Sequence, residues 1–168
     1  EKCTIPEGKQ ELFDSLPEEY SHLYLAIENQ LAGVICIEDP LREESASVVR
    51  ALKGAGFQKV VMMTGDNERT AAFIARKAGV DEYYSEVLPE DKAMFIEKEK
   101  AKGKKVLMVG DGINGAPALT RADMGIAIGA GADVAIDAAD VVLMKSRLSD
   151  VAAAIRLSHR TIRNIHEN

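Results

Sequence analysis

The chain has 168 residues, with 21 Lys and Arg against 27 Asp and Glu, a net charge of −6, and a hydrophobic content of 46%. This acidic balance, with the basic residues spread along the chain, argues against a nucleic-acid partner. Cys3 and Cys36 stand in no pattern typical of a disulfide framework or a zinc site, and no apolar run reaches the roughly 18–20 residues that span a bilayer. We therefore expect a soluble globular fold with a small appendage.

The first part of the chain predicts a hairpin followed by a helix. Apolar runs at 24–27 and 31–37 are separated by three polar residues, as in two antiparallel strands joined by a turn, and a short helix is expected before them at 11–16. Asp39 can cap a helix that has Pro40 at its first position.

After this helix, short apolar strands alternate with amphipathic helices. The strands are expected at 60–63, 106–109, 125–128 and 141–144, and the helices from Pro40 to Gly54 or Gly56, through 71–78 to a stop at Gly79, from Pro89 to Lys102, from near Asn114, and over 148–166. The alternation predicts an α/β fold: a mainly parallel, Rossmann-like sheet with helices on both faces. Ligands of such sheets bind at the carboxyl ends of the strands.

One polar motif falls at such a strand end. Thr64 offers a hydroxyl and Gly65 an accessible amide, both suited to phosphate oxygens, and Asp66 adds a carboxylate for a metal ion or a sugar hydroxyl. The alternative is an ordinary turn, since Gly-Asp and Asp-Asn pairs are common in turns.

A second motif, Gly-Asp-Gly, ends the strand at 106–109 and presents Asp111. The helix expected near Asn114 would turn its free amides toward the same place, and such amides attract anions. A carboxylate beside an anion site suits Mg²⁺, which prefers carboxylate and phosphate oxygens. The alternative is a strand-to-helix turn that needs only glycine and a capping Asp.

Lys92, at the start of the helix between the two motifs, could neutralise phosphate charge as a compact cation. The alternative is a lysine on a solvated helix face. Together the motifs supply a hydroxyl and an amide, then a cation, then a metal-binding acid. Phosphoryl transfer needs such a series because it depends on positioning the transferred group and offsetting its charge. No residue of the series identifies a nucleophile.

These motifs also occur in the order and spacing of the P-type ATPases, phosphoryl-transfer members of the haloacid dehalogenase superfamily. The resemblance is carried by Met63-Thr64-Gly65-Asp66-Asn67, by Leu88-Pro89-Glu90-Asp91-Lys92, and by Gly110-Asp111-Gly112-Ile113-Asn114 followed by Ala116-Pro117-Ala118-Leu119. Asp39-Pro40-Leu41-Arg42 resembles the family's hinge between the nucleotide-binding and phosphorylation domains. Residues 129–144 and 163–168 resemble the branch that pumps heavy metals such as copper and zinc.

The resemblance implies a haloacid dehalogenase-like fold, with residues 1–30 as the C-terminal remnant of a nucleotide-binding domain and 31–168 as the phosphorylation domain. It also implies a role for each motif residue. Thr64 and Gly65 would hold the phosphate, Asp66 would lie near the nucleotide phosphates and metal, Lys92 would contact the phosphoryl group, Asp111 would bind Mg²⁺, Asn114 would orient the site, and Asp39 and Arg42 would act in the hinge.

By the same resemblance, the parent protein would be an ATP-driven heavy-metal cation pump that forms an aspartyl phosphate from Mg-ATP. The partners of this segment would be the nucleotide-binding, actuator and transmembrane domains of the same polypeptide, and the transported cation. The segment would be a cytoplasmic domain of an integral membrane protein. The identity of the ion is outside this chain, because its ligands would lie in membrane helices.

Two departures from the family pattern lead to further expectations. Gly115 stands where the family has a second aspartate beside the magnesium site, so we expect weaker Mg²⁺ binding. The D-K-T-G-T motif with the phosphorylated aspartate is absent, so the chain is expected to be an internal fragment that does not turn over ATP. The missing strand would leave a slot between 60–63 and 106–109, which we expect the segment 31–37, or a strand exchanged from another copy, to fill.

Two other interpretations stay open. A soluble haloacid-dehalogenase-like phosphatase shares the threonine, lysine and acid series, although the residues at 117–119 and the hinge at Asp39 favour the pump. A degenerate, non-catalytic module that binds phosphate or a partner domain is favoured by Gly115.

Overall fold

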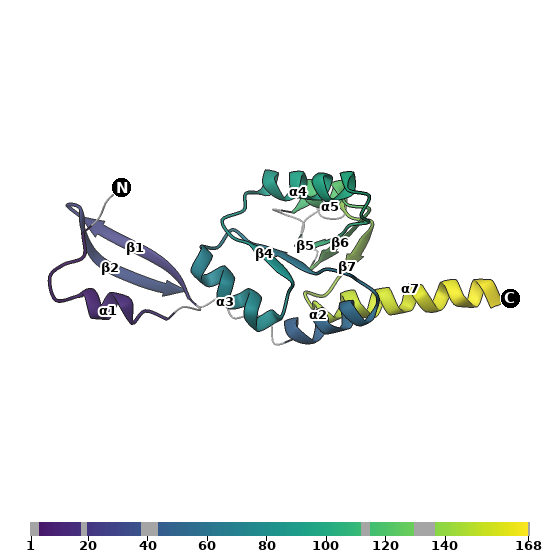
Figure 1. Cartoon of the computed structure of the whole chain (residues 1–168), viewed down its shortest axis with the longest axis horizontal. Helices are drawn as coiled ribbons and strands as arrows, with labels where there is room; N and C mark the ends of the chain where they lie inside the picture. The colour runs from purple at the N-terminus through teal and green to yellow at the C-terminus, as the bar shows by residue number, and fades with distance from the viewer. Residues whose placement is uncertain (1–3, 18–19, 38–43, 112–114, 130–136, 168) are drawn as a thin grey trace.

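The computed structural model describes residues 4–17, 20–37, 44–111, 115–129 and 137–167, and Figure 1 shows how its helices and strands are arranged. Asp39, Arg42 and Asn114 lie outside these ranges. The elements are, in chain order, α1 (Gln10–Asp14), β1 (Ser21–Ile27), β2 (Gln30–Ile37), α2 (Ser45–Gly54), β3 (Val61–Met63), α3 (Glu68–Ala78), β4 (Glu82–Tyr84), α4 (Pro89–Ala101), β5 (Leu107–Gly110), α5 (Ala116–Arg121), β6 (Met124–Ile128), β7 (Val141–Leu143) and α7 (Ser149–Glu167).

The predicted hairpin is confirmed. β1 and β2 pair antiparallel, and the turn between them contains Glu28 and Asn29 with positive φ angles of 49° and 63°. Two-residue turns with positive φ match the twist of paired strands, which makes them the commonest hairpin connection. The hairpin lies to one side of the other strands in Figure 1, and α3 contacts its flanking segment, since Thr70 Oγ1 donates to the Tyr20 carbonyl at 3.4 Å.

The expectation that the segment 31–37 fills a slot between β3 and β5 is wrong. β2 pairs with β1 in a separate two-stranded sheet of the described chain. The reason is local: a strand that folds back across a tight turn closes a very short loop, so its pairing costs less chain entropy than insertion between distant strands.

The rest of the chain forms the expected parallel α/β fold. Within the described ranges, β3 pairs in parallel with β4, and β5, β6 and β7 form a second parallel sheet in that order. Helices α4 and α5 lie on one side of the strands, and α2, α3 and α7 lie on the other (Figure 1). The prediction of helices on both faces is therefore confirmed.

The described part of α2 begins at its N-cap, Glu44, and its first helical residue is Ser45. The start expected at Pro40 after Asp39 lies outside the described residues. A tertiary contact holds this N-cap residue: a Glu44 carboxylate oxygen accepts a hydrogen bond from the backbone N–H of Leu148, 104 positions away in the sequence.

The helix expected from near Asn114 begins at Ala116, with Gly115 as its N-cap. Pro117 then stands in the first turn, where its fixed φ and missing N–H are tolerated. The strand β4 was not predicted, because its three residues, Glu82, Tyr83 and Tyr84, form no apolar run.

Aspartates placed directly before parallel strands join the strand starts. In each case the aspartate N–H donates to the backbone carbonyl of a residue at the beginning of the neighbouring strand or directly before it, and the aspartate side chain accepts the N–H of that same residue. The pairs in the described ranges are Asp81 with Val60, at 2.9 and 2.8 Å, Asp123 with Val106, at 2.9 and 2.9 Å, and Asp140 with Gly125, at 2.9 and 2.8 Å. The Val106 N–H is the main cause that lowers the pKa of Asp123. Each pair sets the register of two adjacent strands.

The core lies on both faces of β6. Ile126 and Ile128 are buried against Val151 and Ile155 of α7, and Ala127, on the opposite face of the strand, packs with Leu119 of α5. Successive side chains of a strand point to opposite faces of the sheet, so those of β6 pack alternately against α7 and α5.

None of the helices in the described ranges combines the length and the apolar character that a membrane span needs.

Candidate functional site

The loop after β3 contains a hydroxyl and a carboxylate that are already paired with each other. Thr64 Oγ1 donates to Asp66 Oδ2 at 2.6 Å and accepts the backbone N–H of Asp66 at 3.1 Å. Both side chains are half-buried, and Gly65 between them is exposed. A ligand that accepts a hydrogen bond from the Thr64 hydroxyl must displace the Asp66 carboxylate. A ligand can reach the backbone of Gly65 directly, because this residue is exposed.

Backbone hydrogen bonds hold this loop against the segment that follows β4. Thr64 N–H donates to the Tyr84 carbonyl at 3.0 Å, Glu86 N–H to the Asp66 carbonyl at 2.8 Å, and Val87 N–H to the Thr64 carbonyl at 2.9 Å. The same segment leads directly into α4. The loop at 64–66 and the start of α4 are therefore brought together.

Lys92 lies in the first turns of α4 and is half-buried. Its ammonium group makes no hydrogen bond or ion pair with the part of the chain that the structure describes. The neighbouring Asp91 carboxylate accepts the backbone N–H of Leu88 at 3.2 Å, which caps the helix. Lys92 is thus carried by the helix that begins beside the loop at 64–66.

Asp111 is exposed directly after the last residue of β5, Gly110. Gly115, on the other side of residues 112–114, is buried with a φ of −102°, an angle that any residue can adopt. A Cβ at Gly115 would lie 3.9 Å from Gly110 Cα, an ordinary contact distance. A Cβ is therefore accommodated at this position by the described residues, which do not themselves require a glycine there.

The described side chains contain no group of three or more His, Cys, Asp or Glu that could hold a metal ion by themselves. Mg²⁺ does not need such a cage, because it commonly binds one or two carboxylates and completes its shell with phosphate oxygens and water. Asp111 fits this mode of binding, as one exposed carboxylate at the carboxyl end of a parallel strand.

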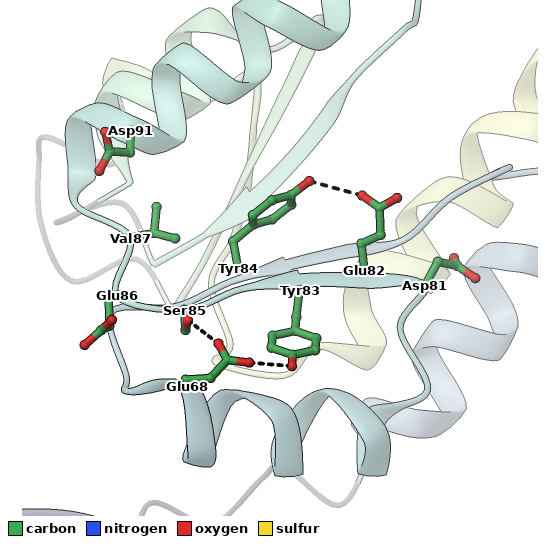
Figure 2. Close-up of a pocket in the computed structure, with 9 residues that line it drawn as sticks. All are labelled: Glu68, Asp81, Glu82, Tyr83, Tyr84, Ser85, Glu86, Val87 and Asp91. Atoms are coloured by element: carbon green, nitrogen blue, oxygen red, sulfur yellow. Dashed lines mark hydrogen bonds between the residues drawn. The ribbon is translucent and has the colours of Figure 1, made fainter.

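An open pocket between α3, β4 and the start of α4 is acidic and does not suit a phosphate (Figure 2). Its lining includes the carboxylates of Glu68, Asp81, Glu82, Glu86 and Asp91. A surface of one sign of charge repels ions of that sign. The phosphate-binding candidates at 64–66 and 92 are not among its lining residues.

The expected site residues thus fall into two groups. The first is the loop at 64–66 with Lys92, joined by the hydrogen bonds to the segment after β4; the second is Asp111 with Gly115 at the end of β5. Helix α4 begins beside the first group and packs against α5, the helix that follows the second group. At the C-terminal ends of these two helices, Lys100 Nζ donates to the Arg121 carbonyl at 2.8 Å. Asp39, Arg42 and Asn114 lie outside the described residues.

The sequence reasoning overlooked the side chains around the first group, above all Glu68, Tyr83 and Ser85. The signal that could have found them is the pair of tyrosines between Gly79 and Pro89, because tyrosine favours strands.

Comparison with known proteins agrees with this architecture. The family described as haloacid dehalogenase-like hydrolase matches residues 4–123. The chain is 53% identical over 148 residues to Copper-transporting ATPase 2 of Rhizobium meliloti (strain 1021), an alignment that covers 88% of this chain and 18% of that protein. It is 49% identical over 146 residues to Copper-transporting ATPase 2 of Homo sapiens, with 87% and 10% covered. The chain therefore spans less than a fifth of the length of these relatives.

Solved structures give the same result. A zinc-transporting PIB-type ATPase superposes with a TM-score of 0.77 and 35% identity, over 96% of this chain and 26% of that one. The catalytic domain of the CPx-ATPase CopB-B superposes with a TM-score of 0.62 and 32% identity, over 73% and 47%. The chain belongs to the haloacid dehalogenase-like hydrolase family, and it is similar in sequence and in fold to segments of heavy-metal P-type ATPases.

Proposed function

We propose that this chain is the phosphorylation domain, with the end of the nucleotide-binding domain, of an ATP-driven heavy-metal cation pump. The observation that carries the proposal is the placement of Thr64–Asp66 and Asp111 at the carboxyl ends of two parallel strands, with Lys92 beside the first. The identity with copper-transporting ATPases and the superposition on a zinc-transporting ATPase support it.

In this function the chain's own residues bind and neutralise phosphate. Thr64 and Gly65 hold phosphate oxygens, Lys92 offsets their charge, and Asp66 lies toward the nucleotide phosphates. Asp111 is the carboxylate for Mg²⁺, which supplies further charge neutralisation when it is bound. Asn114 orients the site, and Asp39 and Arg42 act in the hinge. The phosphorylated aspartate and ATP hydrolysis belong to the whole polypeptide, because the chain contains no D-K-T-G-T motif.

The partners follow from the same proposal. They are the nucleotide-binding, actuator and transmembrane domains of one polypeptide, with this segment on the cytoplasmic side of the membrane, and a heavy-metal cation as cargo. The hairpin supports a division into two units, because Leu23, Leu25 and Ile35 on one of its faces are each more than half exposed and can be covered by the rest of a nucleotide-binding domain. The pairing of β1 with β2 favours a boundary after Ile37 over one at residue 30.

Magnesium-dependent phosphate binding tests the site. Inorganic phosphate, titrated into the chain with and without Mg²⁺, should shift the amide signals of residues 64–66 in NMR spectra, more strongly with Mg²⁺. Lys92→Ala should weaken phosphate binding, and Asp111→Asn should remove the dependence on Mg²⁺. Gly115→Asp should tighten Mg²⁺ binding by about tenfold or more, the size of effect typical of a group next to a metal site, and Gly115→Asn should not, because it has the same shape without the charge.

The outcomes separate the candidate functions. Phosphate that fails to bind the unmodified chain, but binds Gly115→Asp, would favour the degenerate module, for which Gly115 is the specific observation.

The coding sequence on both sides of this segment separates the pump from a soluble phosphatase. A D-K-T-G-T motif upstream and apolar spans on both flanks would establish the pump, and a short reading frame without spans would overturn it.

A further inference from the structure

A carboxylate outside the proposed phosphate site joins the two segments that shape it. Glu68, in the first turn of α3, accepts hydrogen bonds with both of its oxygens (Figure 2). Tyr83 Oη donates to Oε1 at 2.7 Å, and Ser85 Oγ donates to Oε2 at 2.6 Å. The donors are 15 and 17 positions away in the sequence, so these contacts connect a helix start to β4 and to the segment after it.

The two ends of this connection lead to the same loop. Glu68 follows the loop at 64–66 after one residue, Asn67, whose side chain caps α3 by accepting the Thr70 N–H at 3.0 Å. Ser85 precedes Glu86, whose N–H donates to the Asp66 carbonyl at 2.8 Å. Loop, helix start and the segment after β4 therefore form a closed ring of contacts, and Glu68 is its side-chain link.

The hydroxyls of Tyr83 and Ser85 stabilise the charged Glu68 carboxylate in a pocket that is lined by other carboxylates. Glu86 and Asp91 are also among the lining residues of this pocket, and burial by itself raises the pKa of Glu68. The Ser85 hydroxyl, followed by that of Tyr83, nevertheless lowers the pKa of Glu68 below its ordinary value of 4.5. Glu68 is therefore ionised at neutral pH and accepts both hydrogen bonds.

We propose that Glu68 is a positioning residue: with Tyr83 and Ser85 it forms a clamp, the Glu68 clamp, that fixes the loop at 64–66 in the shape that binds phosphate. The inference rests on the proposed function, because it names how that same site is kept in order. Glu68 touches no phosphate itself, and its charge alone would oppose phosphate binding. The clamp acts through backbone geometry.

The charge provides a matched control. Glu68→Ala and Glu86→Gln each remove one negative charge from the same pocket, and the second leaves the clamp in place. By electrostatics alone both variants bind phosphate as well as the unmodified chain or better. If the clamp positions the loop, Glu68→Ala instead binds phosphate several-fold more weakly, and Tyr83→Phe and Ser85→Ala each show part of this loss. Glu68→Gln, which keeps an acceptor oxygen, falls between Glu68→Ala and the unmodified chain.

Amide hydrogen exchange in the 168-residue chain gives a readout that does not depend on phosphate. In Glu68→Ala the amides of Glu86 and Val87, which bond to Asp66 and Thr64, should exchange at least about tenfold faster, since local opening controls exchange. The amide of Ala127 in β6 should keep its rate, which excludes general destabilisation.

The inference is overturned if the Glu86 and Val87 amides keep their exchange rates in Glu68→Ala, or if they exchange faster while phosphate affinity does not fall. Failure of the proposed function has a different signature. In that case the unmodified chain binds no phosphate with Mg²⁺, and the exchange rates alone show whether the clamp holds the loop.

Discussion

Glu99 is a buried acid whose charge is retained by two lysines. It is 8% exposed on α4, and the ammonium groups of Lys102 and Lys104 donate to its two oxygens, the second at 2.6 Å. These hydrogen bonds, that of Lys102 first, lower the pKa of Glu99 from 4.5 to about 2. A carboxylate with a lower pKa in the folded chain than in the unfolded chain stabilises the fold fully above the unfolded pKa. The stabilisation is lost as the pH falls from about 4.5 toward about 2.

Glu99→Gln should therefore lower the free energy of unfolding at pH 7, and its difference from the unmodified chain should shrink between pH 4.5 and pH 2. Urea unfolding at a series of pH values measures this. Glu90→Gln, on the exposed side of the same helix, is the control and should show no such change over this range. A Glu99→Gln difference that is as large at pH 2 as at pH 7 would contradict the assignment of the stabilisation to this ion pair.

The elements α5 and β6 approach each other so closely that the strand needs a glycine. A Cβ at Gly125 would lie 2.7 Å from the Leu119 carbonyl oxygen and 3.2 Å from the Leu119 Cβ. This contact joins the short helix after the Asp111 motif to the central strand of the second sheet. Packing against β6 stabilises α5, because an isolated helix of six residues is not stable in water.

Gly125→Ala should destabilise the fold by about 1–3 kcal/mol, the usual cost of inserting a methyl group into a packed site. Gly54→Ala, at the end of α2 where a Cβ meets nothing within 4 Å, is the matched control and should be nearly neutral. The midpoints of chemical unfolding compare the two. Equal midpoints for the variants would show that α5 can move away from β6 without cost.

In the described chain each parallel sheet is open at both ends, and β3 and β5, which flank the expected slot, each pair on one side only. β3 pairs with β4 on one edge, and β5 pairs with β6 on one edge. Unpaired strand edges are templates for association with another chain. Because β2 pairs with β1, it does not fill the expected slot between β3 and β5. The other expectation, a strand exchanged from another copy, stays a prediction.

The 168-residue chain should therefore self-associate as its concentration rises. Under the proposed function, a longer chain that includes an upstream D-K-T-G-T segment should remain monomeric, because the strand of that segment would occupy the open edges. Sedimentation equilibrium at increasing concentration measures both. An extension of equal length with a scrambled D-K-T-G-T segment is the control and should self-associate like the short chain. A short chain that stays monomeric at all concentrations would refute this prediction.

The sequence by itself determined the class of fold and the position of the site motifs along the chain. The glycine stops, the apolar runs and the turn at Glu28 and Asn29 are local features, and a local preference that agrees with the fold can be recognised before the fold is known. For the same reason Thr64, Gly65, Asp66, Lys92 and Asp111 could be proposed from spacing and residue type alone.

Only the tertiary structure decided how these pieces contact each other. The contact of Glu44 with Leu148 joins residues 104 positions apart. The pairing of β2 depends on competition between a local and a distant partner, and β4 consists of three residues without an apolar pattern. The Glu68 clamp, likewise, joins residues that are 15 and 17 positions apart. Such contacts depend on which distant backbone groups meet after folding, and no local periodicity encodes that.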